Sequence, residues 1–363
     1  MNLFFYLLMV ASGFIGTLHE LLYKRTNYYL LGSVLVLYVI TMCSRIGFSD
    51  PEKSDLNSYL EFFEDAEETY FELGYLFITN IARNIFGKSP YVLISTVDIW
   101  IIAFVMLAAW LSGRQFKHVI DREEDDDVFF YPTCFFFIFS LYWGSHFGSE
   151  TLRIGMATSL LYCSCALAVN SKMLSAFIIA LVTVLFHTSA IVFAIFVLVL
   201  YIVPNLNLKL FSFVFTVLLI LDVLLNIFNS YSIPYVSQLF EMMSEIDEMT
   251  HYAAYSTQEA SSYFDTQYLT YHILGFAMLF GDLSDSRYNK AVQFYYVGLA
   301  FGTFFQSILV VMRLQWLFLA MVVLVLYYFV INDRYSLPVR LSVLSVFSVI
   351  QQIMLLRVLG WHL

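Results

Sequence analysis

The sequence predicts an all-α polytopic integral membrane protein with about twelve transmembrane helices (between about ten and fourteen). Of its 363 residues, 60% are hydrophobic and 19% aromatic, but only 13% are charged. Soluble domains carry about 25% charged residues, so this composition is typical of a protein embedded in a bilayer. Long apolar runs separated by short polar segments take up the chain. We therefore expect a single transmembrane domain over residues 1–363.

The apolar runs that are long enough to cross a bilayer, or nearly so, follow one another along the whole chain. They are residues 2–18, 28–44, 90–111, 128–146, 153–170, 173–187, 189–203, 210–229, 268–281, 291–312, 314–331 and 338–356. The stretch 173–203 is too long for one helix, and His187-Thr188-Ser189 interrupts it. We predict a broken helix pair around residue 187, where polar backbone must face protein or water. The first run has no basic flank and no clear cleavage site, so we expect a retained span rather than a signal peptide.

The basic residues are concentrated in one set of alternate loops, which predicts the orientation of the chain. These loops are placed in the cytoplasm, and they carry Lys24, Arg25, Arg114, Lys117, Arg122, Lys172, Lys209, Arg287, Lys290, Arg334 and Arg340. The net charge of −10 argues against nucleic acid as a partner.

Two longer segments are predicted to face outward. Residues 45–89 form an acidic extracytoplasmic loop, in which 59–86 has the pattern of one amphipathic helix lying on the membrane surface. Residues 230–267 form a second extracytoplasmic loop that is rich in tyrosine and acidic residues. The four cysteines show neither a zinc pattern nor a disulfide framework.

Arg45, Arg153, Arg313 and His187 fall at or near the outer ends of apolar runs. An ionisable group at membrane depth costs several kcal/mol unless it faces a partner or a wet cavity. Guanidinium groups bind phosphate oxygens through two parallel hydrogen bonds, so these arginines predict a pyrophosphate site. The alternative is that each arginine is an interfacial anchor or the partner of a nearby acid such as Glu150, and that His187 is a core histidine.

A histidine can accept a proton from a sugar hydroxyl near neutral pH, so His187 is a candidate general base. Asp55, together with Tyr59, is the alternative acid–base group. The outer tyrosines, such as Tyr255, suit either stacking on sugars or the aromatic belt of the membrane. The sequence contains no P-loop, dinucleotide-binding fingerprint, metalloprotease motif or Asp-x-Asp pair. We therefore predict no metal, no other cofactor and no soluble nucleotide-sugar donor.

The order of these residues resembles the EpsG family of polysaccharide polymerases, which is related in role to the Wzy-type O-antigen polymerases. The matching positions are Arg45, Asp55-x-x-x-Tyr59, Glu72-Leu73-Gly74-Tyr75, Arg153-Ile154-Gly155-Met156-Ala157, Phe186-His187-Thr188-Ser189-Ala190 and Arg313. The chain departs from the family pattern at Leu73, where a proline is usual, and at Ile154, where many members have glutamine.

The resemblance implies a glycosyltransferase of the bacterial cytoplasmic (inner) membrane, with its active site facing the periplasm or the cell exterior. It would join oligosaccharide repeat units carried on polyprenyl pyrophosphate, as in O-antigen, capsule or exopolysaccharide biosynthesis. Its partners would be this lipid-linked oligosaccharide, the lipid bilayer and, as a candidate, a chain-length regulator protein.

The resemblance also implies roles for individual residues. Arg45, Arg153 and Arg313 would hold the pyrophosphate, and His187 or Asp55 would activate the acceptor hydroxyl. The remaining candidates for contact with the substrate are Tyr59, Glu72, Glu150 and Tyr255.

Two other functions fit some of these features. A flippase of lipid-linked sugars would predict inverted repeats and charges near the middle of the membrane, and no repeat is visible. A membrane acyltransferase that modifies a cell-surface glycan would also use histidine and arginine, but it would need an entry for a cytoplasmic acyl donor.

Overall fold

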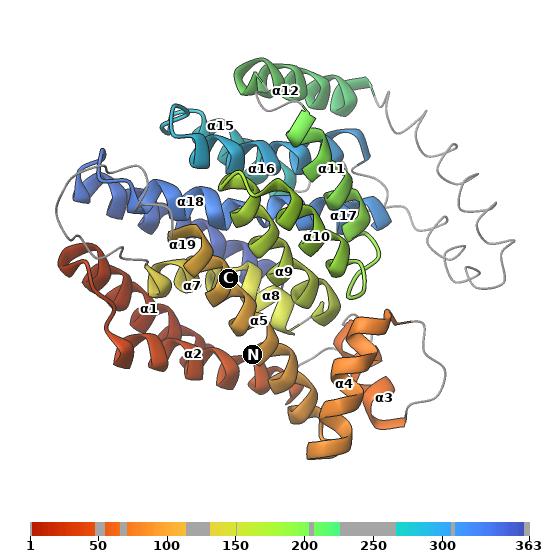
Figure 1. Ribbon diagram of the computed structural model, residues 1–363. Coiled ribbons are helices and arrows are strands. Elements are labelled where there is room, and N and C mark those ends of the chain that lie inside the picture. The colour runs from red at the N-terminus through yellow and green to blue at the C-terminus, as the bar shows by residue number, and fades with distance from the viewer. Residues whose placement is uncertain are drawn as a thin grey trace, which may run out of the picture. The chain divides into compact units, whose positions relative to one another are not determined.

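The computed structural model describes residues 2–47, 55–65, 71–113, 131–149, 151–202, 207–225, 266–305 and 309–358. Every regular element within these ranges is a helix (Figure 1). The helices form two compact units, residues 1–197 with 326–363 (unit 1) and residues 198–325 (unit 2).

Among the described residues, six helical stretches are long and apolar enough to cross a membrane. They are Leu3–Tyr23, Tyr28–Ile46, Pro90–Gly113, Leu152–Val169, Leu314–Ile331 and Leu337–Leu356. Four further apolar helices are between 10 and 17 residues long. The prediction of an all-α polytopic membrane protein is therefore confirmed.

Unit 1 begins with a helical hairpin. Helix α1 (Leu3–Tyr23) and helix α2 (Tyr28–Cys43) are joined by a short turn, in which Lys24 takes a left-handed φ of 53°. The side chain of Asn27 accepts hydrogen bonds from the first backbone N–H groups of α2, which would otherwise lack partners. The 3-10 helix η1 (Ser44–Gly47) follows. The N–H of Asn2 donates to Ser44 Oγ at 2.8 Å, so the start of α1 and the end of α2 lie together.

Two helices stand where the sequence predicted one amphipathic helix over 59–86. Helix α3 covers Asp55–Asp65 and helix α4 covers Leu73–Phe86, and the two helices lie side by side (Figure 1). The Tyr59 ring of α3 lies 5.7 Å from the Tyr75 ring of α4. The prediction of one continuous helix was wrong, because Glu72 has an extended backbone (φ −65°, ψ 146°) that starts α4 anew. Helix α4 packs against α5 (Pro90–Gly113) and buries Tyr75, Thr79 and Ala82.

The centre of unit 1 is formed by α9 (Leu152–Val169), which is almost completely buried and packs against α5 and α10. It is preceded by α7 (Pro132–Leu141) and α8 (Trp143–Ser149). The carboxylate of the buried Glu20 accepts hydrogen bonds from the N–H groups of Thr133 (3.0 Å) and Cys134 (2.9 Å). A carboxylate at a helix N-terminus satisfies backbone donors and interacts favourably with the helix dipole, which fixes α7 against α1.

The predicted break around residue 187 is present. Helix α10 (Met173–Thr183) ends in a series of turns, and α11 (Ala190–Ile202) begins after them. The ring of Phe186 lies in the break and packs on Trp100 of α5, with 4.8 Å between the ring centroids.

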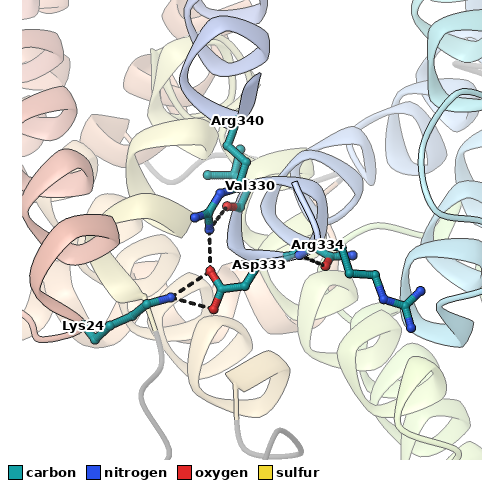
Figure 2. Close-up of polar contacts among 6 residues, drawn as sticks. Lys24, Val330, Asp333, Arg334 and Arg340 are labelled. Carbon is teal, nitrogen blue, oxygen red and sulfur yellow. Dashed lines mark hydrogen bonds and ion pairs between the residues drawn. The ribbon is translucent and has the colours of Figure 1, made fainter. Parts of the chain in front are cut away.

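The last helices of the chain return to the first. The turn between α18 (Val322–Ile331) and α19 (Leu337–Val358) carries Asp333, and Figure 2 shows its contacts. Lys24 Nζ lies 2.8 Å from both Asp333 carboxylate oxygens, and Arg340 Nη1 donates to Asp333 Oδ1 at 2.8 Å and to the Val330 carbonyl at 3.2 Å. Arg340 is buried, whereas Arg334 in the same turn is exposed.

The helix ends of unit 1 gather in two groups at opposite ends of the helices. One group contains the turn at Lys24 and the turn at Asp333, together with the far ends of α5 and α9, where Asn170 Nδ2 donates to the Leu111 carbonyl at 2.8 Å. The other group contains the end of α2, the start of α9 and the break between α10 and α11. Among the described basic residues of unit 1 that the sequence placed in the cytoplasm, Lys24, Lys172, Arg334 and Arg340 belong to the first group. Arg45, Arg153 and His187 belong to the second.

Unit 2 contains α12 (Leu208–Leu225), α15 (Thr266–Met278), α16 (Ser286–Phe305) and α17 (Leu309–Leu319), with α16 in contact with the other three. The Tyr295 and Tyr296 hydroxyls donate to the carbonyls of Tyr271 (2.8 Å) and Gly275 (2.9 Å), which hold α16 against α15. Most of the predicted loop 230–267 lies outside the described residues.

Candidate functional site

Arg153 lies in the first turn of α9, and its guanidinium contacts side chains from α3 and α4. Its Nη1 is 2.6 Å from Glu72 Oε2, and its Nε donates to the Tyr59 hydroxyl at 3.3 Å. The guanidinium carbon also lies 4.6 Å from the centroid of the Phe71 ring, a distance at which cation–π attraction operates. Glu72 and Arg153 are both mostly buried, so their ion pair is only partly screened by solvent.

The second carboxylate oxygen of Glu72 connects this pair to the break between α10 and α11. Oε1 accepts hydrogen bonds from the Thr188 N–H at 3.2 Å and from the Thr188 hydroxyl at 3.5 Å. We call Tyr59, Glu72, Arg153 and Thr188 the Arg153 cluster. Its members come from four separate segments of unit 1. Glu72 connects Arg153 with Thr188, because each of its carboxylate oxygens contacts one of them.

Gly74 allows α4 to approach the break closely. Its N–H donates to the Leu185 carbonyl at 2.7 Å. A Cβ atom at residue 74 would lie 2.7 Å from the same carbonyl oxygen, which is shorter than real contacts allow. A glycine at this position is therefore needed to keep Glu72 beside Thr188.

His187 is buried next to the Arg153 cluster, and its ring orientation limits its chemistry. The Ser189 N–H donates to His187 Nδ1 at 3.3 Å. A ring nitrogen that accepts a hydrogen bond carries no proton, so the neutral ring has its proton on Nε2. In this arrangement Nε2 is the donor atom of the ring and Nδ1 is its acceptor.

Tyr75 is a neighbour of the cluster that the sequence analysis did not single out as a site residue. Its ring lies 5.7 Å from Tyr59 and 5.4 Å from Phe71, and its hydroxyl is fully buried without a hydrogen bond among the described residues. Burial, and then the nearby Tyr59, raise the pKa of Tyr75 well above its ordinary value, so it keeps its proton. Thr188 was not predicted as a site residue either. Both Tyr75 and Thr188 nevertheless belong to the segments that resemble the EpsG family.

The predicted site residues divide into those that the structure brings together and those that it leaves elsewhere. It joins Tyr59, Glu72 and Arg153 directly, and it joins the His187 segment to them through Thr188. Arg45 is buried in η1 at the end of α2.

Four other predicted residues have side chains that fall outside the described parts of the chain. Asp55 opens α3 one helical turn before Tyr59, and Arg313 belongs to α17 of unit 2, but neither side chain is described. Glu150 and Tyr255 lie outside the described residues altogether.

The Arg153 cluster pairs a guanidinium with a carboxylate and leaves one guanidinium nitrogen for a further contact. Nε and Nη1 of Arg153 are occupied by protein partners, whereas the described residues offer no hydrogen-bond partner to Nη2. A guanidinium that is oriented by two protein contacts can present its remaining donor to phosphate at little entropic cost. Among the residues that the structure describes, no group of three or more His, Cys, Asp or Glu is placed to hold a metal ion.

Comparison with known proteins identifies one family. The model of the EpsG family matches residues 32–360, a range that includes the whole Arg153 cluster and His187. No similar curated protein and no similar solved structure was found. Because the match covers nearly the whole chain, this protein belongs to the EpsG family, a family of Wzy-type polysaccharide polymerases.

Proposed function

We propose that this protein is a glycosyltransferase that joins polyprenyl-pyrophosphate-linked oligosaccharide repeat units on the extracytoplasmic side of the membrane. The observation that carries the proposal is the Arg153 cluster, in which a fixed guanidinium lies beside the His187 segment at one end of unit 1. In the reaction, a hydroxyl oxygen of the acceptor unit attacks the anomeric carbon of the donor glycan. The bond from that carbon to the pyrophosphate oxygen breaks, the hydroxyl proton passes to a base, and polyprenyl pyrophosphate leaves.

Arg153 would stabilise the leaving group in this reaction. Negative charge grows on the pyrophosphate as the glycosidic bond breaks, and a preoriented donor beside it lowers the barrier without reorganising. Glu72 acts as a positioning residue, because both of its carboxylate oxygens already accept hydrogen bonds, one from Arg153 and the other from Thr188. Arg45 and Arg313 are proposed as further pyrophosphate ligands, and Glu150 and Tyr255 as glycan contacts.

The hydrogen bond from Ser189 bears on the choice of base. Since Nδ1 of His187 accepts that bond, the proposal assigns His187 to hydrogen-bond donation from Nε2 and Asp55 to the removal of the proton. Asp55 is supported by its place at the start of α3, one turn before Tyr59 of the cluster.

The two groups of helix ends in unit 1 support the proposal that the Arg153 cluster faces the extracytoplasmic side of the membrane. The Arg153 cluster lies in the group opposite to Lys24, Arg334 and Arg340, and cytoplasmic ends carry the excess of basic residues. In a bacterial inner membrane this arrangement opens the site to the periplasm or the cell exterior.

The test is polymer synthesis by the purified protein from lipid-linked repeat units alone. We expect Arg153→Lys to lower the rate by about tenfold to a hundredfold, since lysine cannot pair with Glu72 and Tyr59 and still donate to a ligand. Arg334→Lys, an exposed arginine in the opposite group, is the matched control and should retain the full rate. Failure of the unmodified protein to polymerise these units, or full activity of Arg153→Lys in folded protein, would contradict the proposal.

A further inference from the structure

Helix α4 carries a row of exposed apolar side chains. Leu73, Phe77, Ile81 and Ile85 are spaced four residues apart and are 75%, 65%, 41% and 66% exposed, respectively. Residues with this spacing share one face of a helix. The opposite face is buried through Tyr75, Thr79 and Ala82, so the apolar row is the outer face of α4. We call these four residues the α4 apolar face.

The α4 apolar face does not belong to a membrane span. With 14 residues, α4 is about 21 Å long at 1.5 Å per residue, which is shorter than the roughly 30 Å of a bilayer core. A short helix with one apolar face is typical of a segment that lies at the membrane interface.

This face begins at the Arg153 cluster. Leu73 directly follows Glu72, whose carboxylate is 2.6 Å from Arg153 Nη1. The Gly74 N–H bond to the Leu185 carbonyl brings the start of α4 against the break, where the Leu185 side chain is 49% exposed. An oriented guanidinium, which is ion-paired with Glu72 through Nη1, therefore adjoins an apolar surface. A ligand with an anionic head for Nη2 and an apolar tail fits this combination.

We infer that the α4 apolar face, together with Leu185, is the docking surface for the isoprenoid tail of a lipid pyrophosphate whose head is held at Arg153. The inference rests on the proposed function and assigns the tail of the same substrate. The tails of ordinary lipids are as apolar as the isoprenoid chain, so the α4 apolar face alone does not distinguish between them. The selection comes from Arg153, and contact between the tail and α4 must therefore depend on Arg153.

This dependence can be measured by photo-crosslinking. The photoreactive residue p-benzoylphenylalanine replaces Phe77 in one variant and Val346 in the control, a similarly exposed (61%) apolar residue on the membrane-spanning α19. Both variants are placed in phosphatidylglycerol nanodiscs with radiolabelled polyprenyl pyrophosphate that carries no sugar. We expect position 77 to take up about ten times more label than position 346. A hydrogen bond to a charged group contributes roughly 1.5–3 kcal/mol to binding, which corresponds to about tenfold or more in affinity.

The excess label at position 77 should disappear with unlabelled polyprenyl pyrophosphate but persist with additional phosphatidylglycerol. It should also fall about tenfold in Arg153→Ala. Competition by unlabelled ligand uses the unmodified cluster, so it decides the question even if Arg153→Ala does not fold.

Three results would overturn the inference: equal labelling of both positions, competition by phosphatidylglycerol, or crosslinks from position 77 to a second copy of the chain. The first two would show a helix that only faces the bilayer, and the third a dimer surface. The polymer assay separates this inference from the proposed function. Polymer synthesis without labelling that depends on Arg153 would overturn the docking surface alone. Labelling that depends on Arg153, without polymer, would overturn the proposed reaction alone.

Discussion

At the scale of single residues, the proposal uses the hydrogen bond between Ser189 and His187 to choose between two chemical roles that the sequence left open. A histidine base needs an unprotonated nitrogen that faces the acceptor hydroxyl. Here the unprotonated nitrogen, Nδ1, already accepts the Ser189 N–H at 3.3 Å. The proton on Nε2 makes the other side of the ring a donor, which fits binding of an oxygen better than removal of a proton.

We expect His187→Gln to retain much of the polymerisation rate, because the glutamine amide places a donor near the position of Nε2. His187→Ala, which lacks a donor, should lose about tenfold or more of the polymerisation rate.

The wild-type rate of polymerisation should be nearly constant between about pH 5 and 8. Aspartate bases ordinarily titrate below this range, near 3.9, whereas histidine bases titrate within it, near 6.5. The measurement is the initial rate of polymer formation across this range. Equal losses in both variants, together with a fall in wild-type rate toward acid pH, would restore His187 as the base.

The sequence predicts three members of the Arg153 cluster, Tyr59, Glu72 and Arg153, but neither Thr188 nor the contacts among them. This prediction depends on the order in which the three residues follow one another along the chain. The ion pair joins residues that are 81 positions apart, and it depends on the extended backbone at Glu72. The sequence therefore suggested a free arginine for pyrophosphate, whereas two of its donor groups are already bound by the protein.

At the scale of elements, the start of α4 and the break between α10 and α11 form one structural unit. The break was predictable, because an apolar stretch of that length with a polar tripeptide inside it cannot be one helix. The division of 59–86 into α3 and α4 was not, since the apolar pattern continues across Glu72 and only backbone geometry shows the interruption.

Replacement of Gly74 by alanine tests this unit. The added Cβ would lie 2.7 Å from the Leu185 carbonyl oxygen and 3.0 Å from the Phe186 ring, so α4 must move away from the break. We expect a loss of about 1–3 kcal/mol in stability, typical of overpacking, and a fall in polymerisation as Glu72 moves away from Thr188. Gly32→Ala in α2 is the matched control, because nothing lies within 4 Å of its added Cβ. Thermal unfolding and polymer assays that show no difference between the two variants would contradict the role given to Gly74.

At the scale of the whole molecule, the distribution of charge between the two groups of helix ends in unit 1 is the basis for the orientation that we propose in the membrane. Lys24, Arg334 and Arg340 share one group, and Asp333 bonds both Lys24 and Arg340 there (Figure 2). The sequence predicted this grouping from loop composition alone, because the rule for basic residues depends on which loop carries them and not on their contacts. Contacts such as the bond between Lys24 and Asp333, which joins residues 309 positions apart, could not be predicted in that way.

The orientation itself can be tested with cysteines introduced at two exposed positions, Glu61 on α3 and Arg334 in the turn before α19. A thiol reagent that does not cross membranes should label Glu61→Cys in spheroplasts and should label Arg334→Cys only after the membrane is opened. The unaltered protein is the control, because three of its four cysteines are buried and Cys43 is half-buried. Label on Arg334→Cys in sealed spheroplasts, with Glu61→Cys protected, would place the Arg153 cluster in the cytoplasm. A polymerase of lipid-linked units would then have to act before those units cross the membrane, and the proposed sidedness would be wrong even if the Arg153 chemistry held.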